Sequence, residues 1–149
     1  MLSKYDKQYL IIMDIGHVVE LKVAYLASVY GIDVSIPCGP FRYDQIWDVN
    51  GNILKIQIKK ATLNKTNNGI VFANCTAKSS YSKGEIDAIV TVYGDQLYFI
   101  PFDEVNSSHK KQLMFFINKE QSKAMRDINW AEDFIIEKQL NIEKIYIDI

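Results

Sequence analysis

The dipeptide Asn50-Gly51 constrains the fold of this chain more than any other feature of its sequence. Both central residues of a type I′ turn need a positive φ, and Asn-Gly is a pair that adopts this conformation readily. After the dipeptide, Leu54, Ile56 and Ile58 alternate with polar residues, which is typical of a half-buried strand. We therefore predict a β-hairpin over residues 41–61, with the Asn-Gly pair as its two-residue loop.

The length of this loop also predicts the pairing of the two strands. A two-residue loop sets Val49 opposite Asn52 and, further from the turn, Asp44 opposite Gln57. Lys59 lies two residues beyond Gln57, so its side chain emerges on the same face. Facing side chains lie about 5 Å apart, and neighbours two residues apart about 6–7 Å. The hairpin therefore gathers a carboxylate, a carboxamide and an ammonium group, although an ordinary solvated strand face could carry the same residues.

A helix is predicted before the hairpin, from Asp14 as its N-cap to about Tyr30, with Gly31 as its terminator. Glu20 lies on a narrow face of this helix that also carries small residues, so the helix can approach a sheet closely there. A glutamate is rarely buried without a partner or a metal. Glu20 therefore lies either at a rim or directed at a site, and residues 1–13 fit either a strand or the entry to the helix.

Other apolar segments predict further strands and a second helix. The strands are expected over residues 32–37, 70–75, 86–93, 96–100 and 113–117, and the helix follows Asn129 over residues 130 to about 140. This order predicts an α/β or α+β fold with a mixed central sheet flanked by helices. The 149 residues are expected to form a single domain, residues 1–149.

Composition and charge narrow the class of protein. No apolar run reaches the roughly 18–20 residues of a membrane span, so no membrane association is expected. The start of the chain lacks the plan of a signal peptide, and Cys38 and Cys75 show no metal-ligand spacing, so a cytoplasmic location is expected. The net charge of −1 argues against a polyanion partner, yet six lysines and no acid lie between Gly51 and Gly84. That segment is a candidate nucleic-acid surface or an ordinary solvated lysine face.

The order of these motifs resembles the active site of the PD-(D/E)XK nuclease superfamily, with Glu20 on a first helix, Asp44 on one strand and Gln57-Ile58-Lys59 on the next. The small homing endonucleases of group I introns are the more similar branch, and archaeal Holliday-junction resolvases share the same core plan. The resemblance covers roughly residues 14 to 104. It is carried by four segments, Glu20-Leu21-Lys22, Arg42-Tyr43-Asp44, Lys55-Ile56-Gln57-Ile58-Lys59 and Gly84-Glu85-Ile86-Asp87.

The resemblance implies a restriction-endonuclease-like core and a metal-dependent, site-specific DNA endonuclease, of the intron-encoded homing type. Asp44 would be the principal ligand of Mg²⁺, for which Mn²⁺ could substitute. Gln57, the backbone carbonyl of Ile58 and Glu20 would supply the other oxygen ligands. Lys59 would orient or help to deprotonate the attacking water and stabilise the transition-state charge.

Two positions depart from the motif, because Gln57 stands where an acid is usual and Tyr43 stands where a proline is usual. A neutral amide oxygen binds a metal less tightly than a carboxylate, so we expect one metal, or weak occupancy without DNA. Asp48 shares a strand face with Asp44 but lies about 13 Å away along the strand, and we predict that it is a turn residue. Trp47 faces the opposite way, toward the core or an interface.

Double-stranded DNA is the expected partner. The candidate DNA contacts are basic or aromatic residues of the hairpin and of the polar loops that follow it, namely Lys55, Lys60, Lys65, Lys78, Tyr81 and Lys83. A duplex has two strands and one chain supplies one site, so a homo-oligomer is expected, either a dimer or a tetramer. Two alternatives stay open at this point: a Holliday-junction resolvase, and a catalytically weak member of the fold that only binds nucleic acid.

Overall fold

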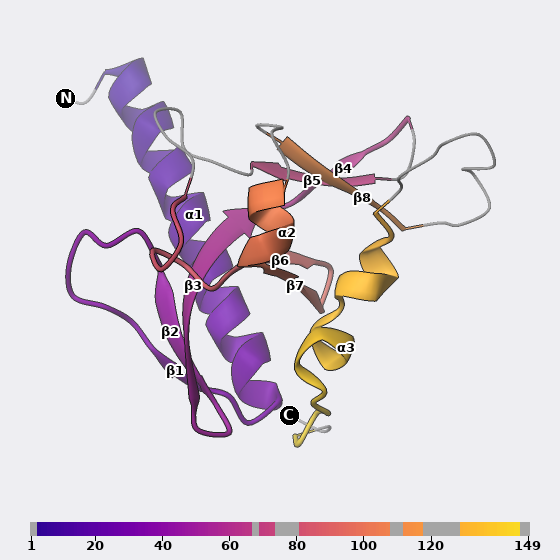
Figure 1. Cartoon of the computed structure of the whole chain (residues 1–149). Coiled ribbons are helices and arrows are strands. Elements are labelled where there is room, and N and C mark those ends of the chain that lie inside the picture. Colours follow the sequence, from indigo (N-terminus) through magenta and orange to yellow (C-terminus); the bar gives the residue numbers. More distant parts are fainter. Residues whose placement is uncertain (1–2, 67–68, 74–80, 108–111, 118–128, 147–149) are drawn as a thin grey trace.

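A five-stranded mixed sheet forms the centre of the computed structural model, which describes residues 3–66, 69–73, 81–107, 112–117 and 129–146 (Figure 1). Its strands lie in the order β1-β2-β3-β6-β7, with β3 and β6 parallel and the other neighbours antiparallel. They are β1 Asp33–Ser35, β2 Gln45–Val49, β3 Asn52–Lys60, β6 Ala88–Tyr93 and β7 Gln96–Pro101. The prediction of a mixed central sheet flanked by helices is therefore confirmed.

The predicted hairpin is formed by β2 and β3, and its register is the one that the loop implies. The pairing runs from Val49 opposite Asn52 to Gln45 opposite Ile56. Asn50 and Gly51 both have positive φ, 52° and 89°, as a type I′ turn requires. The Asp48 carboxylate accepts a hydrogen bond from the Gly51 N–H at 2.7 Å, so its side chain serves the turn as predicted, although its backbone belongs to β2.

One long helix, α1 (Lys4–Val29, 26 residues), covers one face of the sheet (Figure 1). The prediction that it begins at Asp14 is wrong, because no proline interrupts the sequence between Lys4 and Val29 and the helix continues through Gly16. The open choice for residues 1–13 is resolved as helix from Lys4 onward. Its predicted end is confirmed. Gly31 has a φ of 73°, and its N–H bonds the Ser28 carbonyl at 2.9 Å, as in a Schellman C-cap.

The two faces of the central sheet carry two separate clusters of buried side chains. The cluster under α1 includes Val23, Leu26 and Ala27 of the helix and Trp47, Ile56 and Ile58 of the hairpin. The cluster on the opposite face includes residues of α2 (Phe102–Ser107) and of a second, three-stranded sheet. That sheet has the order β4-β5-β8, with β4 Thr62–Asn64, β5 Gly69–Ala73 and β8 Gln112–Phe116. None of the described helices is long and apolar enough to cross a membrane.

The predicted helix after Asn129 is divided into two short helices. A 3₁₀ helix, η2, covers Ala131–Phe134, and α3 covers Ile136–Leu140. Ile135 between them is extended, with φ −61° and ψ 143°, and forms an antiparallel bridge with Tyr98 of β7. The prediction of one continuous helix is therefore wrong at Ile135, because the backbone of this residue pairs with the edge strand β7 instead of continuing the helix.

Candidate active site

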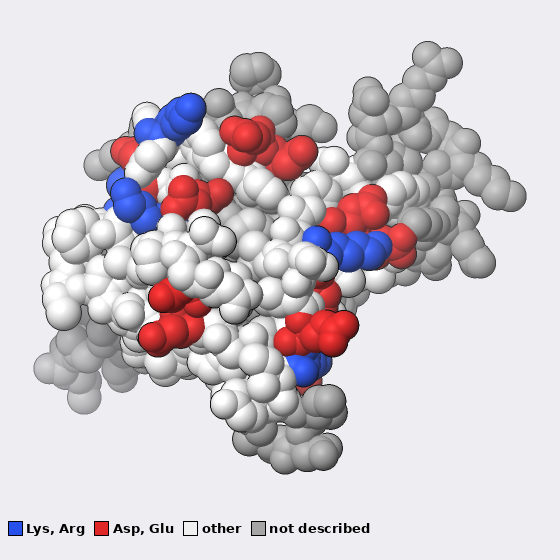
Figure 2. Space-filling view, turned by 60° about the horizontal axis from the view of Figure 1, so that its bottom comes forward, with Lys and Arg blue, Asp and Glu red and all other residues white. Residues whose placement is uncertain are grey.

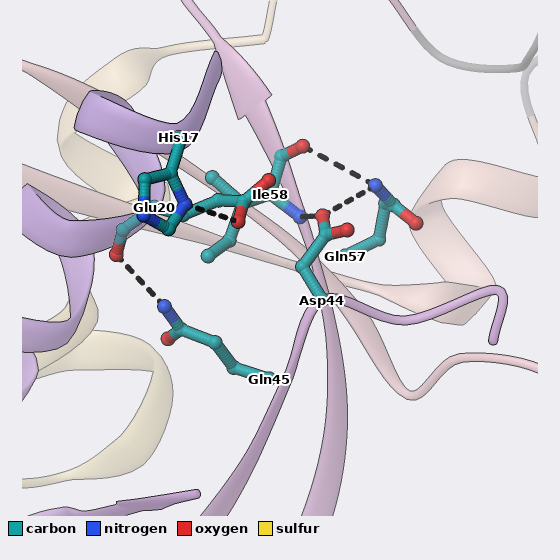
Figure 3. Close-up of polar contacts among 6 residues, drawn as sticks. All are labelled: His17, Glu20, Asp44, Gln45, Gln57 and Ile58. Carbon is teal, nitrogen blue, oxygen red and sulfur yellow. Dashed lines mark hydrogen bonds and ion pairs between the residues drawn. The ribbon is translucent and has the colours of Figure 1, made fainter. Parts of the chain in front are cut away.

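Asp44 lies at the point where β2 begins and β3 continues past it. Its N–H bonds the Ile56 carbonyl at 2.8 Å, so it extends the hairpin ladder by one residue, to a place opposite Gln57. One carboxylate oxygen, Oδ2, accepts hydrogen bonds from the Ile58 N–H at 2.7 Å and from Gln57 Nε2 at 2.5 Å (Figure 3). The carboxylate thus stands against the stretch of β3 that β2 does not cover.

The carboxamide of Gln57 turns its nitrogen toward the other two groups. Nε2 donates to Asp44 Oδ2 and also reaches the Ile58 carbonyl oxygen at 3.3 Å (Figure 3). A carboxylate and a carbonyl only accept hydrogen bonds, so the nitrogen is the end that suits both. To offer its oxygen beside Asp44, Gln57 must therefore turn its carboxamide over.

Glu20 reaches the same place from α1. The Gln45 side chain donates to the Glu20 backbone carbonyl at 2.8 Å, which ties this turn of the helix to the start of β2. His17 Nδ1 lies 3.8 Å from Glu20 Oε2 (Figure 3). Burial, followed by the nearby charge of Asp44, raises the pKa of Glu20, while His17 opposes this rise. Glu20 is therefore directed at the site and interacts electrostatically with Asp44, rather than standing alone at a rim.

The environment of Asp44 disfavours a negative charge on its carboxyl group. Burial raises the pKa of its carboxyl, and the Ile58 N–H, the Lys59 ammonium and the Gln57 amide each oppose that rise. Two carboxylates whose pKa values are raised and whose charges interact are stabilised by a positive charge near both of them. Perturbed carboxylates of this kind cluster at functional sites, and this pair is the described part of the chain that best fits one.

Lys59 lies on the face of β3 that carries Gln57, two residues further along the strand. Its ammonium acts on the carboxyl of Asp44 and lies 5.7 Å from the centre of the Tyr81 ring. The structure thus brings together all four of the predicted catalytic residues, Glu20, Asp44, Gln57 and Lys59, and the backbone carbonyl of Ile58.

Comparison with known proteins decides the family of the chain. The family model described as PD-(D/E)XK endonuclease matches residues 13–137. The chain belongs to the PD-(D/E)XK endonuclease family. Among solved structures, the fold is similar to that of the bacterial homing endonuclease I-Ssp6803I, with a TM-score of 0.68 and 20% identity over 85% of this chain and 89% of that chain. No curated protein sequence matches the chain.

PD-(D/E)XK nucleases generally use divalent metals, and the residues present fit a hard cation. The oxygen donors here are two carboxylates, a backbone carbonyl and, after it turns over, a carboxamide. The described residues contain no group of three or more His, Cys, Asp or Glu side chains that could enclose a metal. Such a donor set suits Mg²⁺, which keeps several waters and takes one or two carboxylates, better than an ion that needs a full protein cage.

The predicted DNA contacts of this PD-(D/E)XK chain fall in different places. Lys55, Lys60, Lys65 and Lys83 are exposed, although Lys60 follows Lys59 directly in β3 and therefore points to the opposite face. Lys55 Nζ donates to the Gly84 carbonyl at 3.0 Å. Lys78 lies outside the described residues. On the face that carries the hairpin turn and the end of α1, Lys and Arg groups are scattered among acids (Figure 2), so that face has no basic character.

Tyr81 is the predicted DNA contact that the structure places differently. Its side chain is only 5% exposed and belongs to the second buried cluster, so the expectation of an exposed loop residue is wrong. The ring is covered by the residues of this cluster and by Arg42, whose guanidinium carbon lies 4.5 Å from the ring centre. A ring in this position faces protein cations rather than a base.

Gln45 is a structural residue of the site that sequence reasoning missed. It is 1% exposed, and its two amide atoms link Trp47 to α1, since Oε1 accepts from Trp47 Nε1 at 2.9 Å and Nε2 donates to Glu20 O. A signal was present, because Gln45 shares a strand face with buried Trp47 and Val49, and a polar residue at a core position needs partners.

We expect Gln45→Leu to destabilise the fold by about 1–3 kcal/mol, because the Trp47 N–H is left buried without an acceptor. The free energy of unfolding from denaturant titration measures this effect. Gln96→Leu is the control, since Gln96 is less buried and its amide bonds Glu137 at 3.0 Å away from the site. Equal stability of Gln45→Leu and the wild type would contradict the proposed link between β2 and α1.

Proposed function

We propose that this chain is a Mg²⁺-dependent, site-specific DNA endonuclease of the homing type, which hydrolyses phosphodiester bonds. The observation that carries the proposal is the contact of Asp44 with Gln57 and the Ile58 N–H, with Lys59 on the same strand face and Glu20 arriving from α1. The family match and the fold of the homing endonuclease I-Ssp6803I support the reaction class.

In this proposal, Asp44 and Glu20 hold the metal with the Ile58 carbonyl, and Gln57 adds its oxygen after it turns over. The ion supplies charge neutralisation and an acidified water when it is bound. Lys59 holds the attacking water in line with the phosphorus and donates hydrogen bonds to the phosphoryl oxygens, where negative charge develops in the transition state. The neighbouring carboxylate of Asp44 keeps the ammonium of Lys59 close to that position.

The substrate in this proposal is double-stranded DNA, bound by the exposed lysines of β3 and of the following loops. Lys55, Lys65 and Lys83 contact phosphates, which position the duplex without reading its sequence. Two copies of the chain, or two pairs, act together, because cleavage of both strands needs two sites of opposite polarity.

One observation favours a second candidate, a member of the fold that binds nucleic acid without cutting it. The Gln57 amide nitrogen already donates hydrogen bonds to Asp44 and the Ile58 carbonyl, so these oxygens have a donor without a cation. Such a protein would bind DNA equally well in Mg²⁺ and in EDTA. We favour the enzyme, because the Gln57 amide donates to Asp44 and Ile58 and not to Glu20. Burial and the charge of Asp44 raise the pKa of Glu20, and a bound cation would relieve this cost of its negative charge.

The experiment that tests the proposal compares three DNA substrates in Mg²⁺ and in EDTA: linear duplex, supercoiled plasmid and a mobile four-way junction. A homing endonuclease cuts duplex DNA that contains its site in Mg²⁺ only. Preference for the four-way junction would favour a resolvase, and binding without cleavage of any substrate would reject the enzyme.

We expect Gln57→Glu to bind Mg²⁺ about tenfold more tightly than the wild type, because a third carboxylate in the proposed site, next to Asp44, adds charge attraction at close range. Without metal, the same variant should unfold at a lower temperature near neutral pH, since the two carboxylates repel each other and the amide hydrogen bond is lost. Isothermal titration calorimetry and thermal melts in EDTA measure the two effects. Gln57→Met removes the amide without adding charge, and it should lack the gain in affinity.

A further inference from the structure

The ring of Tyr81 lies beside two cationic side chains that come from different elements. The Lys59 ammonium of β3 is 5.7 Å from the ring centre, and the guanidinium carbon of Arg42, in the segment before β2, is 4.5 Å from it. Both distances fall within the roughly 6 Å over which a cation is attracted to an aromatic face. The ring is 5% exposed, so water screens this attraction little.

Each of the two cations also interacts with a carboxylate. Arg42 Nε lies 3.7 Å from Glu85 Oε2, and Lys59 acts on the carboxyl of Asp44. The ring of Tyr81 is therefore the neighbour that these two cations share, and each cation also interacts with a carboxylate of its own. The position of the Lys59 ammonium depends on both neighbours, the carboxylate of Asp44 and the ring.

The turn that carries Tyr81 is closed by its own hydrogen bonds. The Ser82 N–H donates to Glu85 Oε2 at 2.7 Å, and the Glu85 N–H donates to the Ser82 carbonyl at 3.1 Å. The carboxylate that faces Arg42 is thus also the one that shapes this turn. Because the turn is closed and the ring is buried, the ring is held in a defined place beside Lys59.

We propose that Tyr81 is a positioning residue for Lys59, holding the flexible lysine chain so that its ammonium stays at the cleavage site. This proposal rests on the proposed function, because it assigns Tyr81 a role in the step that Lys59 carries out. A lysine side chain has four carbons and many rotamers, so an ammonium without a fixed neighbour spends much of its time elsewhere. The role belongs to the ring face and not to the hydroxyl group.

The hydroxyl group of Tyr81 provides a matched control. Its oxygen is buried and has no hydrogen-bond partner among the residues that the structure describes. Tyr81→Phe therefore keeps the ring and loses only this group, whereas Tyr81→Leu keeps an apolar side chain and loses the aromatic face. Phenylalanine and leucine are both large apolar residues, so either fills the space of the ring far better than a small residue would.

The first measurement is the single-turnover rate of DNA cleavage at saturating enzyme and Mg²⁺. We expect Tyr81→Phe to stay within about threefold of the wild type and Tyr81→Leu to be slower by roughly two- to thirtyfold, the range of a cation–π contact. The DNA dissociation constant should change by less than about threefold in both, since the buried ring offers no contact to a base. Equal rates for Tyr81→Leu and the wild type would overturn the proposal while leaving the proposed function intact.

The second measurement needs neither DNA nor metal. A ring close to the Lys59 side chain shifts its ε-methylene protons upfield in a ¹H–¹³C NMR spectrum, in which Lys59→Arg identifies the signal. We expect the upfield shift in the wild type and in Tyr81→Phe and its loss in Tyr81→Leu. An unshifted wild-type signal overturns the placement of Lys59. A shifted signal in a protein that cleaves no DNA would instead overturn the proposed function, and with it the catalytic part of this inference.

Discussion

Lys59→Ala should lower the single-turnover rate of DNA cleavage by about a thousandfold, within the range of 10²–10⁴ for a lost general base or charge-stabilising group. The reason is the position of the Lys59 ammonium, which lowers the pKa of the Asp44 carboxyl. Among the described residues of β3, Lys59 is the cation that acts on this carboxyl, so no neighbouring lysine can replace it. Quenched-flow cleavage at saturating enzyme separates this effect from a loss of DNA binding.

Lys60→Ala is the matched comparison, because Lys60 is the next residue of β3 and points to the opposite face. It should change DNA affinity and the salt dependence of that affinity at most, and leave the saturated rate within about threefold. A rate of Lys59→Ala above a tenth of the wild-type rate, or an equal loss in Lys60→Ala, would contradict the role of Lys59.

Asp44→Asn should reduce cleavage by about a thousandfold or more, because the principal carboxylate of the proposed metal site is lost. Its backbone contact survives, since an amide oxygen can still accept from the Ile58 N–H. DNA binding should be retained or become tighter, because one negative charge near the phosphates is removed. Cleavage assays and DNA titration in Ca²⁺-free buffer with EDTA measure the two properties separately.

The pH dependence of the stability of Asp44→Asn, compared with that of the wild type, gives a second test of the environment of Asp44. The folded-state pKa of Asp44 is raised above its ordinary value of 3.8, so the fold favours the protonated carboxyl. The wild type therefore loses stability relative to Asp44→Asn as the pH rises through that raised pKa, and the difference vanishes below the ordinary value. Thermal melts between acidic and neutral pH without metal should show this divergence.

Asp48→Asn is the control for this variant, because Asp48 lies four residues further along the hairpin and its carboxylate accepts a hydrogen bond from the turn, at the Gly51 N–H. It should leave the cleavage rate unchanged and cost the fold less than about 1 kcal/mol, since an asparagine side chain can accept the same bond. A comparable loss of cleavage in both variants would place the metal ligand elsewhere.

The part of the site on the hairpin could be predicted from local chemistry alone. An Asn-Gly loop of two residues determines which residues face each other, so Asp44 and Gln57 meet without any knowledge of the remaining fold. The alternation of strand faces left Trp47 either in the core or at an interface, and the structure places it in the core, fully buried. The arrival of Glu20 was predictable in part, because an acid on an otherwise small-residue face suggests close packing.

The predictions that failed depend on contacts between distant segments. Tyr81 follows a polar, basic stretch, and its burial comes from its place in a cluster that gathers residues of β5, β6, β7, α2 and β8, which local sequence does not reveal. The break at Ile135 depends on its bridge with Tyr98 of β7.

The central claim is that the pair of Asp44 and Glu20 makes this PD-(D/E)XK chain a metal-dependent nuclease. The most direct test incubates a random-sequence duplex DNA library with the wild type and with Asp44→Asn, in Mg²⁺ and in EDTA, and sequences the cut ends. We predict cuts enriched at discrete, long sites for the wild type in Mg²⁺ alone. No enrichment of the wild type over Asp44→Asn, or equal cutting in EDTA, would contradict the account.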